Sequence, residues 1–390
     1  DHRRLVAEEC NLQPRAGGRR IRSRPPELVE SLSLIVQARV LRDDPTVWIM
    51  DVCHRCNKLQ SIGFRVSKVP TGRKCFCKVA DIAGLYRQAP SDWRSIPVRI
   101  AHVVNTFRTE ADSPHDRAQR MTLESMRVAR DVAPLIDNSL KVRHLAAVVS
   151  DQDVVSDAFD DIIALERTIQ DLARFQVPRP LPLIQDILDG PSLADDEVLI
   201  YTNVDIAVVP NFYAFVADLF RLGLDALIVN RRTVSDTYPG PEALSLAVAE
   251  VGAEHSGYDC FAFRAGIRQQ FVPWQSCVGI AGVMSPLLYN ILAVARAPCV
   301  LLDAHVTFHL GDDKAWQRPE FDDYAALNRE ELVRTFQRLC EDPERKARML
   351  SALADHPGGR GGVPRELRSW RTAPKPKILR RVKHMLRRER

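Results

Sequence analysis

Hydrophobic and polar residues alternate with two different periods along the middle of the chain. From residue 98 onward, short apolar runs typical of strands alternate with longer segments whose apolar residues recur every three or four positions. This pattern predicts an α/β fold, a mixed sheet with helices on both faces. The predicted strands are residues 98–107, 141–150, 197–206, 225–230, 259–264 and 299–302. The predicted helices are residues 117–133, 160–175, 210–222, 241–251, 284–295 and 329–353, the last with a break near Pro343.

The two ends of the chain lack this alternation. Residues 1–97 are Arg-rich and weakly periodic, with only hints of a helix at 26–42 and of a strand at 46–50. Residues 356–390 begin as a Gly- and Pro-rich linker and end in a basic tail. We therefore predict four parts: a poorly defined extension (1–97), an α/β domain (98–316), a helical segment (317–355), and a linker with a basic amphipathic tail (356–390).

Cysteine spacing in the extension raises the possibility of a zinc site. Cys53 and Cys56 are followed, after 18 intervening residues, by Cys75 and Cys77. The second pair has a single spacer residue, and the alternative is an extension without such a site. The four cysteines of the remaining chain stand in apolar or mixed contexts, so we expect reduced thiols buried as small hydrophobic side chains.

Charge separates the ends of the chain from its middle. Residues 1–97 carry 18 Lys and Arg against 10 Asp and Glu, and residues 360–390 carry 12 against 2, which leaves 25 against 38 for residues 98–359. An acidic body does not suit a nucleic-acid binder, so no specific nucleic-acid partner is expected. No apolar run is long enough to span a membrane and no signal peptide is evident, so the expected location is the cytoplasm.

The basic tail has the pattern of an amphipathic helix. Its apolar residues Ile378, Leu379, Val382, Met385 and Leu386 form one stripe among arginines and lysines. Such a helix binds anionic membrane surfaces peripherally, which makes the inner face of the membrane a candidate attachment site. A solvated tail, or one docked on the acidic body, is the alternative.

Two polar side chains follow the most apolar predicted strand. Asn203 and Asp205 come near the end of residues 197–206, and ligands of open α/β sheets bind at the carboxyl ends of strands. Residues two apart on an extended chain point to the same side, so both side chains are expected to face one ligand. A divalent cation that neutralises a diphosphate takes carboxylate and amide oxygens. Alternatively, Asp205 only caps the next helix.

On these residues, the chain resembles the GT-A glycosyltransferases over residues 98–316. Asn203-Val204-Asp205 stands at the Asp-x-Asp position of that family, with Asn in place of the first Asp. The resemblance implies a GT-A-like, Rossmann-like mixed sheet and a nucleoside diphosphate sugar as donor. It also implies a Mn²⁺ or Mg²⁺ ion held by Asp205, Asn203 and a late histidine, although the Asn puts metal dependence in question.

The same resemblance implies further donor contacts. Residues after the first strand of GT-A enzymes commonly contact the nucleoside, and they correspond to Asn105, Thr106 and Phe107 here. Arg167 and Asp186 are similar in placement to the Arg or Lys and the Asp that help to bind the donor.

Three later segments complete the predicted site. His309 is a better candidate than His305 for the late histidine, because it precedes a Gly turn and two acids. A structural role for His309 at a strand end is the alternative. Asp259 is the candidate base that takes the acceptor hydroxyl proton, although it can equally stabilise its own turn. Asn230 and Arg231 end another predicted strand and are candidate contacts to the diphosphate or acceptor.

The sequence therefore predicts a metal-assisted, hexosyltransferase-like enzyme. It would move a sugar from a nucleoside diphosphate sugar to a hydroxyl of a glycan, a lipid-linked acceptor or a cell-surface polysaccharide precursor. One alternative is a nucleotidyltransferase, which typically has a Gly-rich basic loop after its first strand, whereas residues 105–109 contain no Gly. The other is a non-catalytic membrane-associated protein with a degenerate GT-A site.

Overall fold

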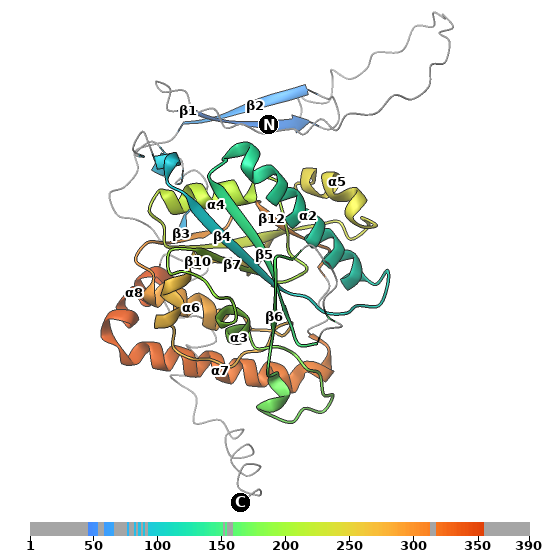
Figure 1. Ribbon diagram of the computed structural model, residues 1–390, viewed down its shortest axis with the longest axis vertical. Helices are drawn as coiled ribbons and strands as arrows, with labels where there is room; N and C mark the ends of the chain where they lie inside the picture. Colours follow the sequence, from blue (N-terminus) through green and yellow to red (C-terminus); the bar gives the residue numbers. More distant parts are fainter. Residues whose placement is uncertain are drawn as a thin grey trace, which may run out of the picture. The chain divides into compact units, whose positions relative to one another are not determined.

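The computed structural model describes residues 46–53, 58–65, 76–77, 93–150, 153, 159–312 and 317–354, with residues 82, 85, 86 and 89. The chain divides into two units, Asp1–Val66 and Ser67–Arg390. In the first, β1 (Thr46–Cys53) and β2 (Lys58–Arg65) form an antiparallel hairpin, which confirms the strand expected at 46–50 (Figure 1). The expected helix at 26–42, two of the four cysteines of the zinc hypothesis and the basic tail lie outside the described residues. The zinc site and membrane binding therefore stay predictions.

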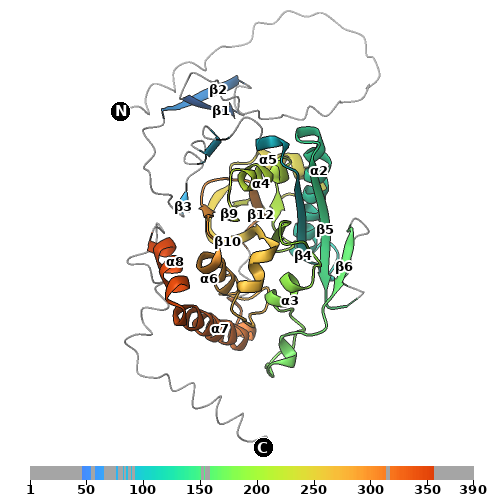
Figure 2. The same cartoon turned by 60° about the vertical axis from the view of Figure 1, so that its left-hand side comes forward.

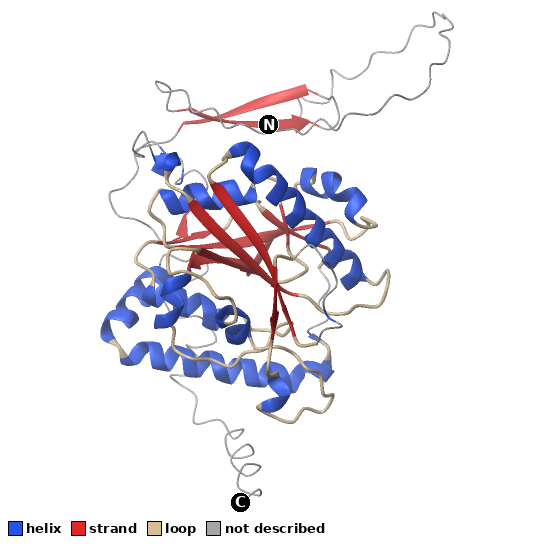
Figure 3. Ribbon diagram, in the orientation of Figure 1, coloured by secondary structure: helices blue, strands red, loops and turns tan. Residues whose placement is uncertain are grey.

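A ten-stranded mixed sheet organises the second unit (Figure 3). Its main path runs β3 (Phe76–Cys77), β11 (Pro298–Leu301), β9 (Ala226–Val234), β10 (Ala253–Arg264), β7 (Val198–Thr202), β4 (Val98–Asn105), β5 (Leu140–Val148) and β6 (Asp161–Ala164). Off this path, β12 (Thr307–Leu310) pairs with β9 and with β8 (Ala207–Val208). The strands pair in parallel, except that β10 is antiparallel to β7 and β9 and β12 is antiparallel to β8.

Helices cover both faces of this sheet (Figures 1 and 2). One face carries α2 (Pro114–Ile136), α4 (Phe212–Arg221) and α5 (Leu244–Ala249), and the other carries α3 (Ile184–Asp189), α6 (Ser285–Val294), α7 (Asp322–Glu341) and α8 (Pro343–Ala354). In β7, Val198 and Ile200 enter the core under α4, whereas Leu199 and Tyr201 enter the core under α6. Both faces of β7 are thus buried, which explains its nearly continuous apolar sequence.

The predicted order of elements is largely confirmed, although α3, β8 and β12 were not among the predicted elements and several predicted elements differ in type or bounds. Residues 160–175 are not a helix: they form the edge strand β6, parallel to β5, and a short 3-10 helix, Ile169–Asp171. The β-branched pair Ile162 and Ile163 suits a strand, and Thr168 caps the 3-10 turn reciprocally with Asp171. Strand β7 ends at Thr202 rather than at 206. The C-terminal helix begins earlier than expected, at Asp322, and breaks at Pro343 as expected.

Part of the segment before β4 belongs to the second unit. Strand β3 pairs in parallel with β11, and Ile82 is buried in the core under α4. The hydroxyl of Tyr86 donates a hydrogen bond to Asp218 of α4 at 3.4 Å. The division of the chain at residue 97 stays a prediction.

Two further expectations concern cysteines and membrane spans. Cys260, Cys277 and Cys299 are buried and Cys340 is partly buried, and none of the four forms a disulfide. The burial agrees with the expected role as small hydrophobic side chains, and the reduced state stays a prediction. Among the described residues, no helix combines the length and apolar character needed to cross a membrane.

Candidate active site at the carboxyl end of β7

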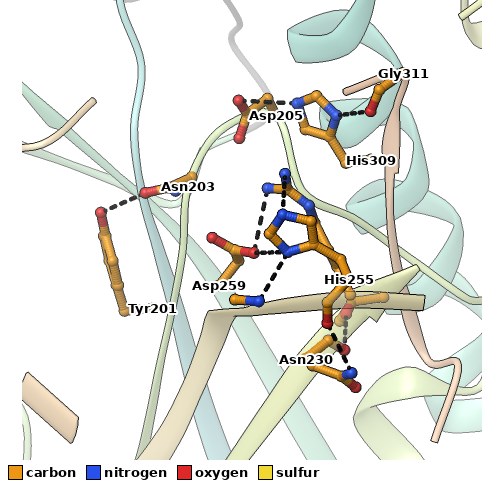
Figure 4. Close-up of polar contacts among 11 residues, drawn as sticks. Tyr201, Asn203, Asp205, Asn230, His255, Asp259, His309 and Gly311 are labelled. Carbon is orange, nitrogen blue, oxygen red and sulfur yellow. Dashed lines mark hydrogen bonds and ion pairs between the residues drawn. The ribbon is translucent and has the colours of Figure 1, made fainter. Parts of the chain in front are cut away.

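Strand register brings the polar segments of the sequence together where β7 ends (Figure 4). Because Cys260 of β10 pairs with Thr202 of β7, the preceding residue Asp259 lies beside the end of β7. On its other side, β10 pairs with the end of β9, where Tyr258 is opposite Asn230. The register shifts on both sides of Tyr258, an irregularity of the kind that redirects side chains next to functional sites.

Asp205 and His309 form the first pair of the site. Asp205 lies in the turn after β7, and its Oδ2 is 3.2 Å from Nε2 of His309 in β12. Burial would raise the pKa of Asp205, but the charge and hydrogen bond of His309, together with Arg231, outweigh burial and lower the pKa to about 2. Burial likewise opposes the charge of His309, yet Asp205 raises the pKa of His309 above its usual value. Both shifts favour the charged forms, so the contact favours an ion pair.

The environment of His309 also makes it a suitable metal ligand. Nδ1 of His309 lies 2.9 Å from the carbonyl oxygen of Gly311, and because a carbonyl only accepts hydrogen bonds, this nitrogen carries a proton. Nε2 is then the nitrogen that loses its proton to bind a metal, and it faces Asp205. Oδ1 of Asp205 is buried without a hydrogen-bond partner, which leaves a second ligand atom available. These two residues fit a divalent cation.

Asn203 lies apart from this pair. Its amide Oδ1 accepts a hydrogen bond from the hydroxyl of Tyr201 at 3.0 Å. The backbone N–H of Ile206 bonds to the carbonyl of Asn203 at 3.0 Å, so residues 203–206 form a turn. The expectation that Asn203 and Asp205 share one side of an extended strand is therefore wrong, because a turn lacks the two-residue alternation of a strand. A role for Asn203 at the metal stays a prediction.

Asp259 and Arg231 form the second pair, with His255 beside them. Nη1 of Arg231 lies 3.2 Å from Oδ2 of Asp259, and both side chains are largely buried. Burial raises the pKa of Asp259, and the nearby charge of Asp205 adds to this, against the lowering effect of Arg231. Burial and Arg231 lower the pKa of His255, so its imidazole is neutral. A buried carboxylate with a raised pKa is suited to accept a proton.

The predicted nucleoside contacts end β4, the strand next to β7. Asn105 donates to the carbonyl of Ala147 at 2.8 Å, and the Thr106 hydroxyl donates to the carbonyl of Asp153 at 2.7 Å. Phe107 exchanges two hydrogen bonds with Gln119 and is 40% exposed as a residue. Because β4 and β7 are parallel, these residues lie at the same edge of the sheet as Asp205.

Arg167 and Asp186 form a bidentate ion pair with both N–O distances at 2.7 Å. Asn230 donates to the carbonyl of His255 at 3.1 Å, which fastens the end of β9 to β10. Within the described part of the chain, no hydrogen bond or ion pair joins the Arg167 pair to Asp205 or Asp259. The structure thus brings Asp205, His309, Arg231 and Asp259 together, with Arg167 and Asp186 outside this group.

No protein-family model matches the chain, and no curated protein matches it significantly. Its structure is similar to that of S. aureus TarS residues 1–349 in complex with UDP-GlcNAc, at a TM-score of 0.37 and 12% identity, covering 64% of this chain and 72% of that one. It is also similar to M. tuberculosis glucosyl-3-phosphoglycerate synthase in complex with Mg²⁺ and uridine diphosphate. That match has a TM-score of 0.34 and 15% identity, and covers 67% of this chain and 84% of that one. Both matches are similarities of fold only, and the expected mixed sheet with helices on both faces is present in the structure itself.

Two residues of the site had no role in the sequence prediction, namely His255 and Tyr201. The only sequence feature that points to His255 is the glycine at position 257. A Cβ at that position would lie 2.7 Å from the His255 ring. Tyr201 is buried within β7 and its sequence context is that of a core residue.

Proposed function

We propose that this protein transfers a sugar from a nucleoside diphosphate sugar to the hydroxyl group of an acceptor. The observation that carries the proposal is the meeting, at one edge of the sheet, of an Asp205–His309 ion pair and a buried Asp259 held by Arg231. The first pair suits a cation and a diphosphate, and the second suits a proton acceptor with a fixed counter-ion. Glycosyl transfer needs both groups, because the bond between the sugar and the diphosphate breaks while a bond between the sugar and the acceptor oxygen forms.

Asp205 and His309 would hold a divalent cation through Oδ1 and Nε2. No group of three His, Cys, Asp or Glu side chains within the described residues is arranged for a metal ion, so the diphosphate and water would supply the other ligands. When bound, such a cation neutralises the charge that develops on the leaving diphosphate. Arg231, which acts electrostatically on Asp205, adds positive charge at the same place.

Asp259 would act as the general base. Its carboxylate accepts the proton of the acceptor hydroxyl while the hydroxyl oxygen forms its bond to the anomeric carbon and the diphosphate departs with the electron pair of the broken bond. Burial favours this role because it raises the pKa of Asp259, which makes the carboxylate more basic. Arg231 keeps the carboxylate in place through its ion pair at 3.2 Å.

Asp205→Asn tests this proposal. The side chain keeps its size but loses its charge, so we expect turnover to fall by roughly two to three orders of magnitude, as when about 3–4 kcal/mol of transition-state stabilisation is removed. Asn203→Asp, which adds a carboxylate in the same turn, is the matched variant and should preserve or strengthen metal binding. Donor hydrolysis or transfer and metal-dependent nucleotide binding are the measurements.

The melting temperature of each variant is the control for folding. A folded Asp205→Asn protein with full activity and an unchanged metal response would remove Asp205 from the mechanism. Metal-dependent nucleotide binding without turnover by the wild type would favour the non-catalytic alternative.

A further inference from the structure

The tautomer of His255 follows from its contacts. The backbone N–H of Gly257 donates to Nδ1 of His255 at 3.0 Å, whereas Oδ2 of Asp259 is 3.9 Å from the same nitrogen, too far for a hydrogen bond. Nδ1 is thus an acceptor, and the proton of the neutral ring is on Nε2.

This tautomer sets two hydrogen-bond donors side by side. Nε2 of His255 is 3.4 Å from Nη2 of Arg231, which only donates. Two N–H donors cannot bond to each other, so both require an oxygen between or beside them. Nε of Arg231 is also buried without a hydrogen-bond partner. The cluster therefore has unused donors, while the positive charge of Arg231 is paired with the carboxylate of Asp259, whose Oδ2 is likewise buried without a hydrogen-bond partner.

Arg231 cannot rotate freely to relieve this arrangement. Its Nη1 lies 3.2 Å from Oδ2 of Asp259, which leaves Nη2 directed toward His255. Gly257 packs closely against the ring of His255, because a Cβ there would lie 2.7 Å from Cε1 and 3.0 Å from Nδ1 of His255. The two donors are thus positioned before any ligand binds.

We propose that Nε2 of His255 and the guanidinium of Arg231 form a subsite for an anionic oxygen, of a phosphate or carboxylate group, carried by the acceptor. An acceptor-only oxygen satisfies both donors, and the charge of Arg231 strengthens its binding. The assignment to the acceptor rests on the proposed function: Arg231 and His255 adjoin Asp259, the base, whereas the diphosphate is assigned to Asp205 and His309. An acceptor held there would present its hydroxyl beside Asp259.

Inorganic phosphate and uridine diphosphate with Mn²⁺ are the two probes of the test. Binding is measured by the rise in melting temperature across a concentration series for the wild type and for His255→Phe, which keeps a ring but has no donor. His255→Gln retains an N–H donor, and Arg127→Gln removes a surface charge on α2. Phosphate also stabilises proteins by exclusion from their surface, so the difference between variants is the readout.

We expect phosphate to bind about tenfold more weakly to His255→Phe, and to bind to His255→Gln and Arg127→Gln within about threefold of wild type. Uridine diphosphate with Mn²⁺ should bind equally to all four proteins. Gly257→Ala, which displaces the His255 ring, should reproduce the effect of His255→Phe and serves if that variant does not fold.

Equal phosphate binding by wild type and His255→Phe would overturn the subsite. If uridine diphosphate bound more weakly to His255→Phe and phosphate competed with uridine diphosphate for binding, the anion site would belong to the donor. That result would overturn the assignment to the acceptor. A wild type that binds phosphate through His255 but does not bind uridine diphosphate with Mn²⁺ would refute the proposed function and retain the anion site.

Discussion

Two groups of buried polar residues adjoin the end of β7, and they differ in whether their buried polar atoms have hydrogen-bond partners. Under α4, Thr202 bonds to His102 at 2.9 Å, His102 to Tyr213 at 2.8 Å, and Tyr213 to His144 at 3.0 Å. At the candidate site, Oδ1 of Asp205 and Nε of Arg231 are buried without a hydrogen-bond partner. The first group is a neutral chain, whereas the second holds charges.

This difference separates a structural role from a functional one. A buried polar chain in which every bridging atom has a partner costs little and helps to specify a unique core. Buried charges and unpaired polar atoms are costly for the fold, so a ligand or a reaction is the simplest reason for keeping them. Substitutions in the chain under α4 should therefore mainly change stability, and substitutions at the candidate site should mainly change binding or turnover.

The largest effect is expected for Asp259→Asn at the candidate site. The amide cannot accept the acceptor proton, so turnover should fall by about 10²–10⁴-fold, the usual contribution of a general base. Stability should fall by less than turnover, because Arg231 loses its counter-ion but keeps an oxygen at this position. Steady-state transfer assays and thermal unfolding measure the two quantities.

Leu199→Ala is a matched comparison for Asp259→Asn, since it lies in the core next to the site without contributing a polar group. We expect it to reduce stability by about 2–5 kcal/mol. If Asp259→Asn instead lost stability and kept its turnover, the contrast between the two groups would be wrong.

Acid pH should destabilise the fold through the neutral chain. Burial lowers the pKa of His102 well below its usual value, and burial and Arg130 lower that of His144 to about 3. Both rings stay neutral in the folded protein while the unfolded chain binds protons below pH 6.5. From pH 7 to pH 5 each histidine should therefore cost roughly 2 kcal/mol of unfolding free energy. The pKa of His309 is raised, so its contribution is kept at acid pH and lost as pH rises.

Urea unfolding at the two pH values tests this prediction, with His144→Gln as the variant. The loss of stability between pH 7 and pH 5 should be roughly 2 kcal/mol smaller in the variant, whatever its stability at pH 7. An unchanged pH dependence would mean that His144 is not held neutral.

The alternation of strands and helices was readable from the sequence because burial on both faces of β7 leaves a clear apolar pattern. The prediction failed at residues 160–175, where the exposed edge strand β6 has only the short pattern Ile162-Ile163-Ala164-Leu165. Such a run fits either a helix or a strand.

The candidate site was predictable in its residue types but not in its geometry. Asp205, Arg231 and Asp259 were named from strand ends and turns, which are local features, whereas the late histidine came from the GT-A resemblance and the following Gly turn selected His309. Their meeting depends on the antiparallel register of β10 against β7 and β9 and on its irregularity near Tyr258, which pair residues far apart in the sequence. The His255–Gly257 bond has no signal apart from that glycine.

Tyr213→Phe should have an intermediate effect, confined to stability. It removes the hydroxyl between His102 and His144 and leaves buried ring nitrogens without that partner. The expected cost is about 1–3 kcal/mol of unfolding free energy in urea. Binding of uridine diphosphate with Mn²⁺ should stay unchanged, and a loss of binding in the folded variant would show that the chain under α4 supports the site.

The smallest effect is expected for Tyr201→Phe, at a residue that packs under α6 and contacts the turn of the site. The ring of Tyr201 is buried in the core, whereas its hydroxyl bonds to Asn203 of the turn that carries Asp205. Because the ring is kept, the stability lost should be that of one hydrogen bond, about 0.5–1.5 kcal/mol. If this bond also positions the turn, metal-dependent nucleotide binding should weaken in Tyr201→Phe and stay unchanged in Tyr213→Phe. Equal nucleotide binding by both variants would show that the Tyr201 hydroxyl belongs with the structural chain rather than with the site.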